Sequence, residues 1–286
     1  MRVPPACAVD FDPVDTSSMF NQNRVKVLNL IYSAPQHIPG ELVFLLGNPQ
    51  EERTNSDTDI LFRQDSNFLY ARPAGRAVRD SPLTMRCRLS LVESNSRYLT
   101  GYNLPDVAVA IDVDSGQTMM FVPRKSRSEL IFDGGLDDFE QIKAETGADW
   151  VFYDDEAVGE LQDRFQMSRI HTHDADELVA AFPLLASYDI DDTRLRSYIF
   201  SARMDKSTKE LELLRVSAQV TSKAHENVIR SMVPGTTEYE TESKFLFACN
   251  NCGLRFQSYI PIVGAGKNGA VLHYGTQAHA RDATTF

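Results

Sequence analysis

The sequence predicts an α/β protein in two parts, and three observations support that prediction. Before about residue 200, short apolar runs alternate with segments of helical period, the pattern of a sheet covered by helices. After that point the chain reads as helix, turn, helix, strand, glycine-rich loop and strand. At 286 residues the chain is long enough to bury one large core or two medium ones.

In the first part, the apolar spacing from Phe20 to Ile31 predicts a helix. Two apolar runs, 107–111 and 118–122, lie on either side of Gly116 and predict a β-hairpin. The strands expected here are 42–46, 60–62, 68–70, 107–111, 118–122 and 150–153. The further helices expected are 136–147, 157–165 and 174–181, the last of them ending near Pro183.

The second part begins with two capped helices. Ser207 and Glu210 have the spacing of a capping box, and so do Thr237 and Glu240. Pro234 and Gly235 end the first helix, and Gly253 ends the second. The apolar stripe expected on the first helix is Leu211, Leu214, Ala218, Thr221, Ala224, Val228 and Met232.

Two strands, 255–263 and 270–274, are expected to follow these helices, with a turn at 264–269 between them. By strand alternation, Val271 and His273 face one side, and Leu272 and Tyr274 face the other.

Composition excludes several classes of protein. The net charge is 29 − 40 = −11, so bulk charge does not suggest a nucleic-acid surface. Four cysteines over this length do not form a disulfide framework, which fits a reducing compartment. No apolar run approaches the roughly 20 residues of a membrane span, and the first residues do not resemble a signal peptide. We therefore expect a cytoplasmic protein without membrane or nucleic-acid partners.

The stretch Ala71–Arg97 differs from its surroundings. It holds six arginines, no lysine and two acidic residues, a local charge of +4 in an acidic chain. It shows neither helical nor strand period, and a structureless loop of this length is uncommon inside a compact domain. We interpret it as an insertion or translated intron; the functional alternative is a basic docking loop.

For several other motifs we favour a structural interpretation over a functional one. Gly264-x-Gly266-x-x-Gly269 matches the dinucleotide fingerprint, but a strand rather than a helix is expected after it, so the glycines indicate a tight turn. Cys249 and Cys252 form a lone C-x-x-C, whereas structural zinc needs four ligands, so both are expected in the core. The segment 171–177, with two histidines and three acids, is expected to be a solvated loop and helix start rather than a metal cluster. His225 is expected to be structural.

Several phrases resemble a known family, the Xaa-Pro dipeptidases (prolidases) and aminopeptidases P. The phrase "SYIPIVGAGKNGAVLHYG" is the most specific, supported by "ELELLRVSAQVTSKAHENVI" and "PGTTEYETE". Upstream, "SDTDILFRQDSNFLY" and "AIDVDSGQTMMFVPRK" resemble the N-terminal domain of the same family. The resemblance implies an aminopeptidase-P/creatinase-type mixed-sheet domain over 15–200 and, over 201–286, the first part of an α+β pita-bread catalytic domain.

What the resemblance implies about function is specific. The family hydrolyses the bond before proline with two divalent metals, usually Mn²⁺, that activate a bridging hydroxide and polarise the carbonyl. The residue matching His273 lines the substrate pocket, and Tyr259 and Ile262 match positions near it. The family's two aspartates, one histidine and two glutamates all lie downstream of that histidine. Asp282 matches the turn before the first of them.

On that basis we expect this chain to be truncated before the metal ligands. It then has no catalytic or metal residues, binds no Mn²⁺, and is inactive as a hydrolase by itself. Its expected ligand is an Xaa-Pro dipeptide or a proline-containing peptide, and the family implies a homodimer. The alternatives are a metal-free peptide- or protein-binding module of the same fold, and an inert chain or one that pairs with a full-length partner.

Overall fold

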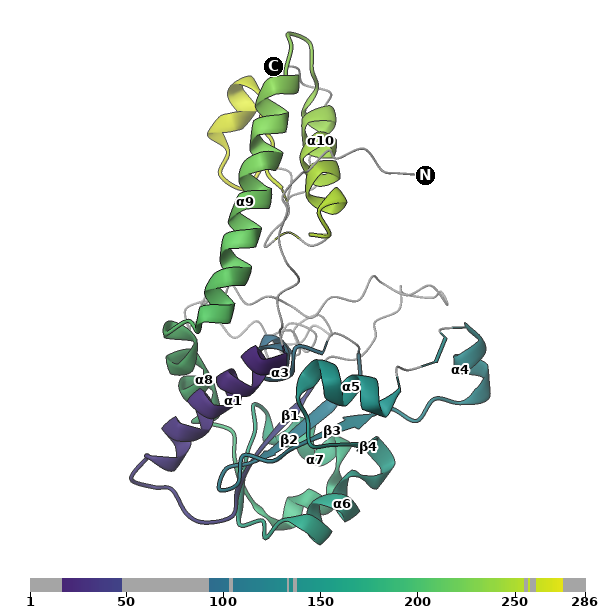
Figure 1. The fold of residues 1–286 in the computed structure, drawn as a ribbon, viewed down its shortest axis with the longest axis vertical. Helices are drawn as coiled ribbons and strands as arrows, with labels where there is room; N and C mark the ends of the chain where they lie inside the picture. The colour runs from purple at the N-terminus through teal and green to yellow at the C-terminus, as the bar shows by residue number, and fades with distance from the viewer. Residues whose placement is uncertain are drawn as a thin grey trace, which may run out of the picture. The chain divides into compact units, whose positions relative to one another are not determined.

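The computed structural model describes residues 17–47, 93–102, 105–132, 134–135, 138–254, 257 and 261–274. It divides into two compact units, a first unit that ends at Ser207 and a second that begins at Thr208 (Figure 1). The expected strands 60–62 and 68–70, residues 71–92, Tyr259 and Asp282 lie outside the described residues. We treat each unit by itself.

The described residues of the first unit form a mixed sheet of six strands. Its order is β4-β3-β2-β1-β5-β6. The pairs β1–β2 and β2–β3 are antiparallel, whereas β3–β4, β1–β5 and β5–β6 are parallel. The strands are β1 (Glu41–Leu46), β2 (Ala108–Asp112), β3 (Thr118–Val122), β4 (Trp150–Tyr153), β5 (Arg169–His171) and β6 (Asp189–Asp191).

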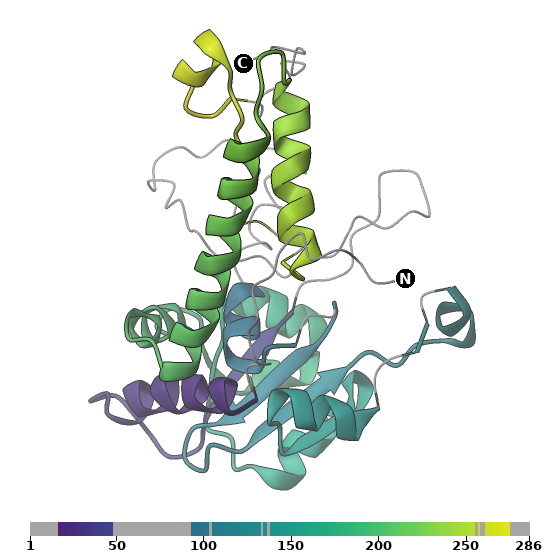
Figure 2. The same cartoon turned by 45° about the horizontal axis from the view of Figure 1, so that its top comes forward.

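Helices cover both faces of this sheet, as Figures 1 and 2 show for α1, α5, α6 and α7. Among the described residues, the α-helices of the unit are α1 (Ser17–Tyr32), α3 (Glu93–Thr100), α4 (Arg127–Phe132), α5 (Phe139–Thr146), α6 (Ala157–Arg164), α7 (Ala175–Ala181) and α8 (Leu195–Met204). The strand period of two divides the core: Val43 and Leu45 pack with α1, α3, α5 and α8, while Leu42 and Phe44 pack with α6 and α7. The mixed α/β fold predicted from the sequence is confirmed.

A buried arginine in α1 forms hydrogen bonds with the C-terminal ends of α3 and α5. Arg24 is 2% exposed and donates to the carbonyl oxygens of Leu99, Thr146 and Gly147 at 2.8, 2.9 and 2.8 Å. The last of these follows α5, where Gly147 adopts a φ of +68° as the left-handed cap. One guanidinium therefore pairs carbonyl groups that the ends of two helices leave without an intrahelical donor.

In its described part, the second unit has the α-helices α9 (Thr208–Ser231) and α10 (Glu238–Asn251), which lie side by side (Figures 1 and 2). The capping box of Thr237 and Glu240 is present, and Gly253 follows α10 with a φ of +81°. Ala224, Ala248 and Cys249 form its buried cluster. The helices are those the sequence predicts, but the stripe is not: Leu211 and Leu214 are 39% and 54% exposed.

Two further expectations need correction. Residues 93–97, assigned to a stretch without helical period, form the first turns of α3, and Leu99 of that helix is fully buried. The helix is short and polar at its start, so its sequence lacks a visible apolar period. The strand expected at 270–274 is also absent: a 3₁₀ helix spans Gly266–Ala270, and a turn follows it.

Candidate functional site

The phrase that includes His273 forms a compact loop in the second unit. The chain runs without regular structure from Pro261 to Ala265, forms the 3₁₀ helix, and turns at 272–274. Gly266 has a φ of +53°, which glycine adopts without strain. This confirms that the glycines serve a tight turn. Because residues 270–274 form local hydrogen bonds rather than pairing with a neighbouring strand, the alternation of a strand does not determine which way His273 faces.

A buried carboxylate holds this loop. Glu238, in the first turn of α10, is 0% exposed. Its Oε1 accepts hydrogen bonds from the Ala265 backbone N–H at 2.6 Å and from Asn268 Nδ2 at 3.1 Å. Its Oε2 accepts from the Tyr274 hydroxyl at 2.8 Å. The Asn268 amide also donates to the Tyr274 hydroxyl at 3.0 Å, so both ends of the loop meet at one side chain.

Two of the three predicted substrate residues, His273 and Ile262, lie within the described part of the phrase. His273 is exposed, and Ile262 is 39% exposed. An accessible imidazole can donate to, or accept from, a peptide carbonyl or carboxylate. The structure thus brings His273 and Ile262 to one loop, with Glu238 as a buried support that the motif comparison did not single out. A glutamate directly after a helix cap was the only sequence signal for it.

We tested whether the described residues fit the metal pair that the family implies. In these ranges, no three histidine, cysteine or acidic side chains gather as a metal site would require. Glu238 is a buried carboxylate that contacts the predicted phrase, and both of its oxygens already accept hydrogen bonds. The described residues therefore do not fit the metals, and we derive no catalytic step through them.

The remaining candidates are structural. Cys249 is buried, and burial raises the pKa of its free thiol. Cys252 is half-buried and forms a disulfide, so only Cys249 lies in the core as expected, and the disulfide is one that the cysteine count did not predict. His225 is exposed beside the Phe245 ring, with the centroids 4.9 Å apart.

The segment 171–177 is not the solvated loop that its acidity suggested. His171 lies in β5 and His173 follows it, and they are only 1% and 7% exposed. Burial lowers the pKa of His171, although Glu41 and Asp191 raise it in part. Burial lowers the pKa of His173 to about 4, and Arg196 adds to this. β5 lies inside the sheet between β1 and β6, so its polar residue His171 is buried.

Paired charges surround His171. Its Nδ1 lies 3.1 Å from Asp191 Oδ2 and its Nε2 lies 3.4 Å from Glu41 Oε1. Glu41 also pairs with Arg169 at 3.0 Å, and Asp191 pairs with Arg194. Burial raises the pKa of Asp191, but hydrogen bonds from Thr193 and Arg194 outweigh it and lower that pKa to about 2. This network neutralises its own charges, which is typical of a structural role.

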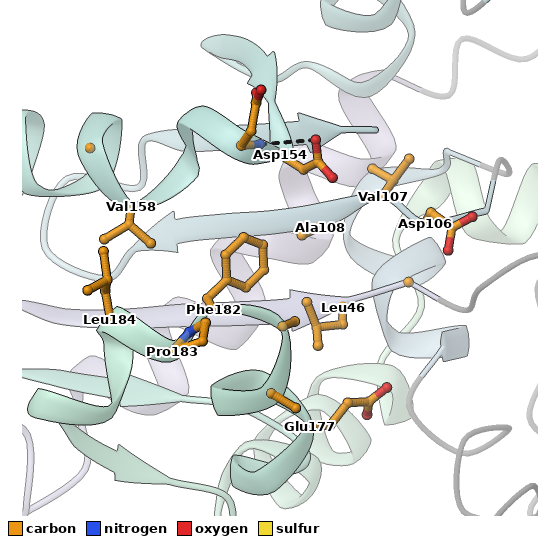
Figure 3. Close-up of a pocket in the computed structure, with 15 residues that line it drawn as sticks. Leu46, Asp106, Val107, Ala108, Asp154, Val158, Glu177, Phe182, Pro183 and Leu184 are labelled. Carbon is orange, nitrogen blue, oxygen red and sulfur yellow. Dashed lines mark hydrogen bonds between the residues drawn. The ribbon is translucent and has the colours of Figure 1, made fainter. Parts of the chain in front are cut away.

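A cavity of about 710 Å³ lies in the first unit, where β1 ends and β2 begins (Figure 3). The Phe182 ring lies in its middle, among the apolar side chains of Leu46, Val158 and Leu184. Two of its acidic side chains are engaged: Asp154 accepts from the Asp155 N–H at 3.0 Å, and Asp155 pairs with Arg124 at 2.8 Å. We assign no ligand to this cavity.

Comparisons with known proteins define the class. The model of the aminopeptidase P N-terminal domain matches residues 92–171, and the model of metallopeptidase family M24 matches residues 212–284. This pair of matches, in this order, defines a two-domain metallopeptidase fold of the pita-bread type. In both parts the chain is similar to the Xaa-Pro dipeptidases and aminopeptidases P.

Individual relatives agree with this assignment. The chain is 29% identical to the Xaa-Pro dipeptidase of Homo sapiens over 274 residues, which is 93% of this chain and 50% of that protein. It is 26% identical to a probable Xaa-Pro aminopeptidase of Pyricularia oryzae over 249 residues, 82% of this chain and 40% of the other. The chain therefore spans about half the length of the curated relatives it matches.

Solved structures share the fold. Aminopeptidase P from E. coli superposes with a TM-score of 0.67 at 21% identity, covering 93% of this chain and 56% of the other. Proline aminopeptidase P II from Yersinia pestis gives 0.67 at 22% identity, with 91% and 55% covered. No helix in the described ranges has both the length and the hydropathy needed to cross a bilayer.

Proposed function

We propose that this chain recognises peptides with proline in the second position, as part of an Xaa-Pro peptidase. The observation that carries the proposal is the alignment with Xaa-Pro dipeptidase over 93% of the chain, which runs through both domain matches. His273, Tyr259 and Ile262 are the residues we assign to the substrate. In this role His273 donates to the carbonyl or carboxylate oxygen of the peptide, while Ile262 contributes apolar contact.

The reaction of the family explains why a dedicated site is needed. The bond before proline is a tertiary amide without an N–H, and the ring fixes its geometry. In that family, a divalent metal pair, usually Mn²⁺, would supply an activated hydroxide and polarise the carbonyl. Because the described residues do not fit such a pair, the role we give to this chain's own residues is to bind and orient the peptide. The 286-residue chain by itself is then inactive in hydrolysis.

A second candidate function is a metal-free module that binds peptides or proteins with the same fold. It is supported by the lack of a metal-ligand group among the described residues, together with the exposed position of His273. It differs from the first candidate in its ligand: a binding module tolerates residues other than proline in the second position.

The test uses the purified 286-residue chain with Gly-Pro and with a longer Xaa-Pro peptide, in the presence of Mn²⁺. We expect no turnover, and saturable binding of Gly-Pro that is weakened in His273→Ala. Gly-Ala is the matched control peptide. Turnover that a chelator abolishes would overturn the inactivity of this chain. Equal affinity for Gly-Pro and Gly-Ala would favour the binding module, and no binding of either peptide would overturn both assignments.

We also propose a cytoplasmic homodimer, on the basis of the resemblance to the family alone. Light scattering of the purified chain tests the dimer, with a mass of 32.1 kDa as the contrary outcome.

A further inference from the structure

The described part of the second unit contains a buried acid that no reaction step uses. Glu238 is fully buried, although a carboxylate is costly to remove from water unless donors satisfy it. It lies in the first turn of α10, where the partial positive charge of a helix N-terminus favours an anion. A side chain that keeps such a position must be stabilised by what it contacts.

Its contacts lie far along the chain, on the predicted substrate loop. Ala265 and Asn268 donate to one oxygen, and Tyr274 donates to the other. These donors are 27, 30 and 36 residues away from Glu238. One carboxylate thus connects the loop 265–274 to the first turn of α10. It also accepts a hydrogen bond from Tyr274, the residue that directly follows His273.

Its neighbour in the same helical turn has a different role. Glu240 is exposed and accepts from the Thr237 N–H at 2.7 Å, which completes the capping box. Glu240 therefore serves the helix, whereas Glu238 serves the loop. The two glutamates form a matched pair for an experiment.

We propose that Glu238 is a positioning residue for His273: by binding both ends of the loop, it fixes the place at which the imidazole meets the peptide. This inference rests on the proposed function for the ligand, but not for the loop itself. The carboxylate does not touch the peptide. It acts by limiting the conformations of the loop before binding, so that less entropy is lost when the peptide binds.

The first measurement is hydrogen exchange in the full 286-residue chain. In the wild-type chain the Ala265 amide is protected, because it donates to Glu238. In Glu238→Gln we expect it to exchange roughly tenfold faster or more, since a buried donor loses its charged acceptor. Tyr274→Phe removes one donor and should give a smaller increase. Glu240→Gln should leave Ala265 unchanged. An unprotected Ala265 in the wild-type chain, or equal exchange in Glu238→Gln, would overturn the inference.

The second measurement separates positioning from general stability. We expect Glu238→Gln to weaken Gly-Pro binding by about fivefold to tenfold, an amount typical of lost preorganisation. Combined with His273→Ala, it should cost little further, because the two residues then act through one contact. An equal loss of affinity in both backgrounds would contradict the inference. If the wild-type chain binds no Xaa-Pro peptide, the proposed function fails, and the exchange at Ala265 alone decides whether Glu238 anchors the loop.

Discussion

The two units are stabilised internally by different kinds of interaction. In the first, both faces of a sheet are covered by helices, and side chains from strands far apart in the sequence are fully buried. In the second, the described helices α9 and α10 share a small buried cluster centred on Ala224, Ala248 and Cys249. What orders the loop beyond them is polar, namely Glu238 and its donors. The first unit thus depends on apolar packing, and the second depends more on caps and hydrogen bonds.

This contrast has a consequence for experiments. The sequence contains one tryptophan, Trp150, which lies in β4 of the first unit. Its fluorescence reports unfolding of the first unit, while amide exchange in α10 and in the loop reports the second. Each prediction below should affect one of these signals more than the other.

The largest expected effect is in the sheet core. Phe44 is fully buried between the rings of Phe121 and Phe182, with centroids 6.1 and 5.2 Å away. Phe44→Ala should lower the free energy of unfolding by about 3–5 kcal/mol, because it removes buried area and leaves a cavity. Urea denaturation followed by Trp150 fluorescence measures this. Ile131→Ala, at a side chain that is 72% exposed, is the control and should change it by less than about 0.5 kcal/mol.

The next effect is polar but lies in the same unit. Burial lowers the pKa of Arg24 to about 10, with a partial opposing effect of Asp149, so the side chain stays charged at neutral pH. Arg24→Met should cost roughly 3 kcal/mol, since it leaves buried carbonyl groups without a donor. The same denaturation curve measures the loss, with exposed Arg127→Met as control. A cost no larger than that of the control would show that water replaces the guanidinium and would weaken the contrast between the units.

Acid should loosen the first unit through His173. Burial lowers its pKa from 6.5 to about 4, so the unfolded chain binds a proton that the folded chain does not. The stability from this group is therefore complete above about pH 6.5 and is lost as the pH falls toward 4, by roughly 3 kcal/mol in total. Urea midpoints between pH 7 and pH 4 measure the slope. In His173→Gln the slope should be smaller; an unchanged slope would contradict the assignment.

The smallest effect belongs to the second unit. Thr237→Ala removes the hydroxyl that accepts from the Glu240 N–H at 3.2 Å, and should cost about 1 kcal/mol of local helix stability. We expect faster exchange of the first amides of α10, while the Trp150 transition stays in place. Ser222→Ala, on the exposed side of α9, is the control. A shift of the Trp150 transition in Thr237→Ala would show that the units unfold together.

The sequence predicts the first unit well wherever the elements are long or strongly apolar. The hairpin around Gly116 and the strand Trp150–Tyr153 lie where the pattern places them, because their apolar runs are bounded by clear turns. The three-residue strands β5 and β6 are missed. Arg169–His171 and Asp189–Asp191 contain mostly polar residues, and only their parallel pairing to β1 and to each other makes them strands.

The candidate site could be predicted only in part. The sequence predicts Ile262 in one strand and His273 in the next, whereas the structure places both outside strands, on either side of a 3₁₀ helix. The expected strand at 270–274 fails because local hydrogen bonds replace a sheet neighbour there. The role of Glu238 could not be predicted from its position in the sequence. Glu238 and Glu240 both lie in the first turn of α10, and only tertiary contacts distinguish the buried Glu238 from the exposed Glu240.

The strand order of the first unit also determines how long each strand waits, during synthesis, for its neighbour in the sheet. β1 lies between β2 and β5, and its parallel partner appears late: Val43 pairs with His171, 171 − 43 = 128 residues further on. At about 5–20 residues per second, a ribosome needs on the order of ten seconds to cover that distance. During that interval one edge of an apolar strand has no permanent neighbour, which is the condition under which nascent chains pair wrongly. We therefore expect the folding yield of this unit to depend on translation speed between β1 and β6.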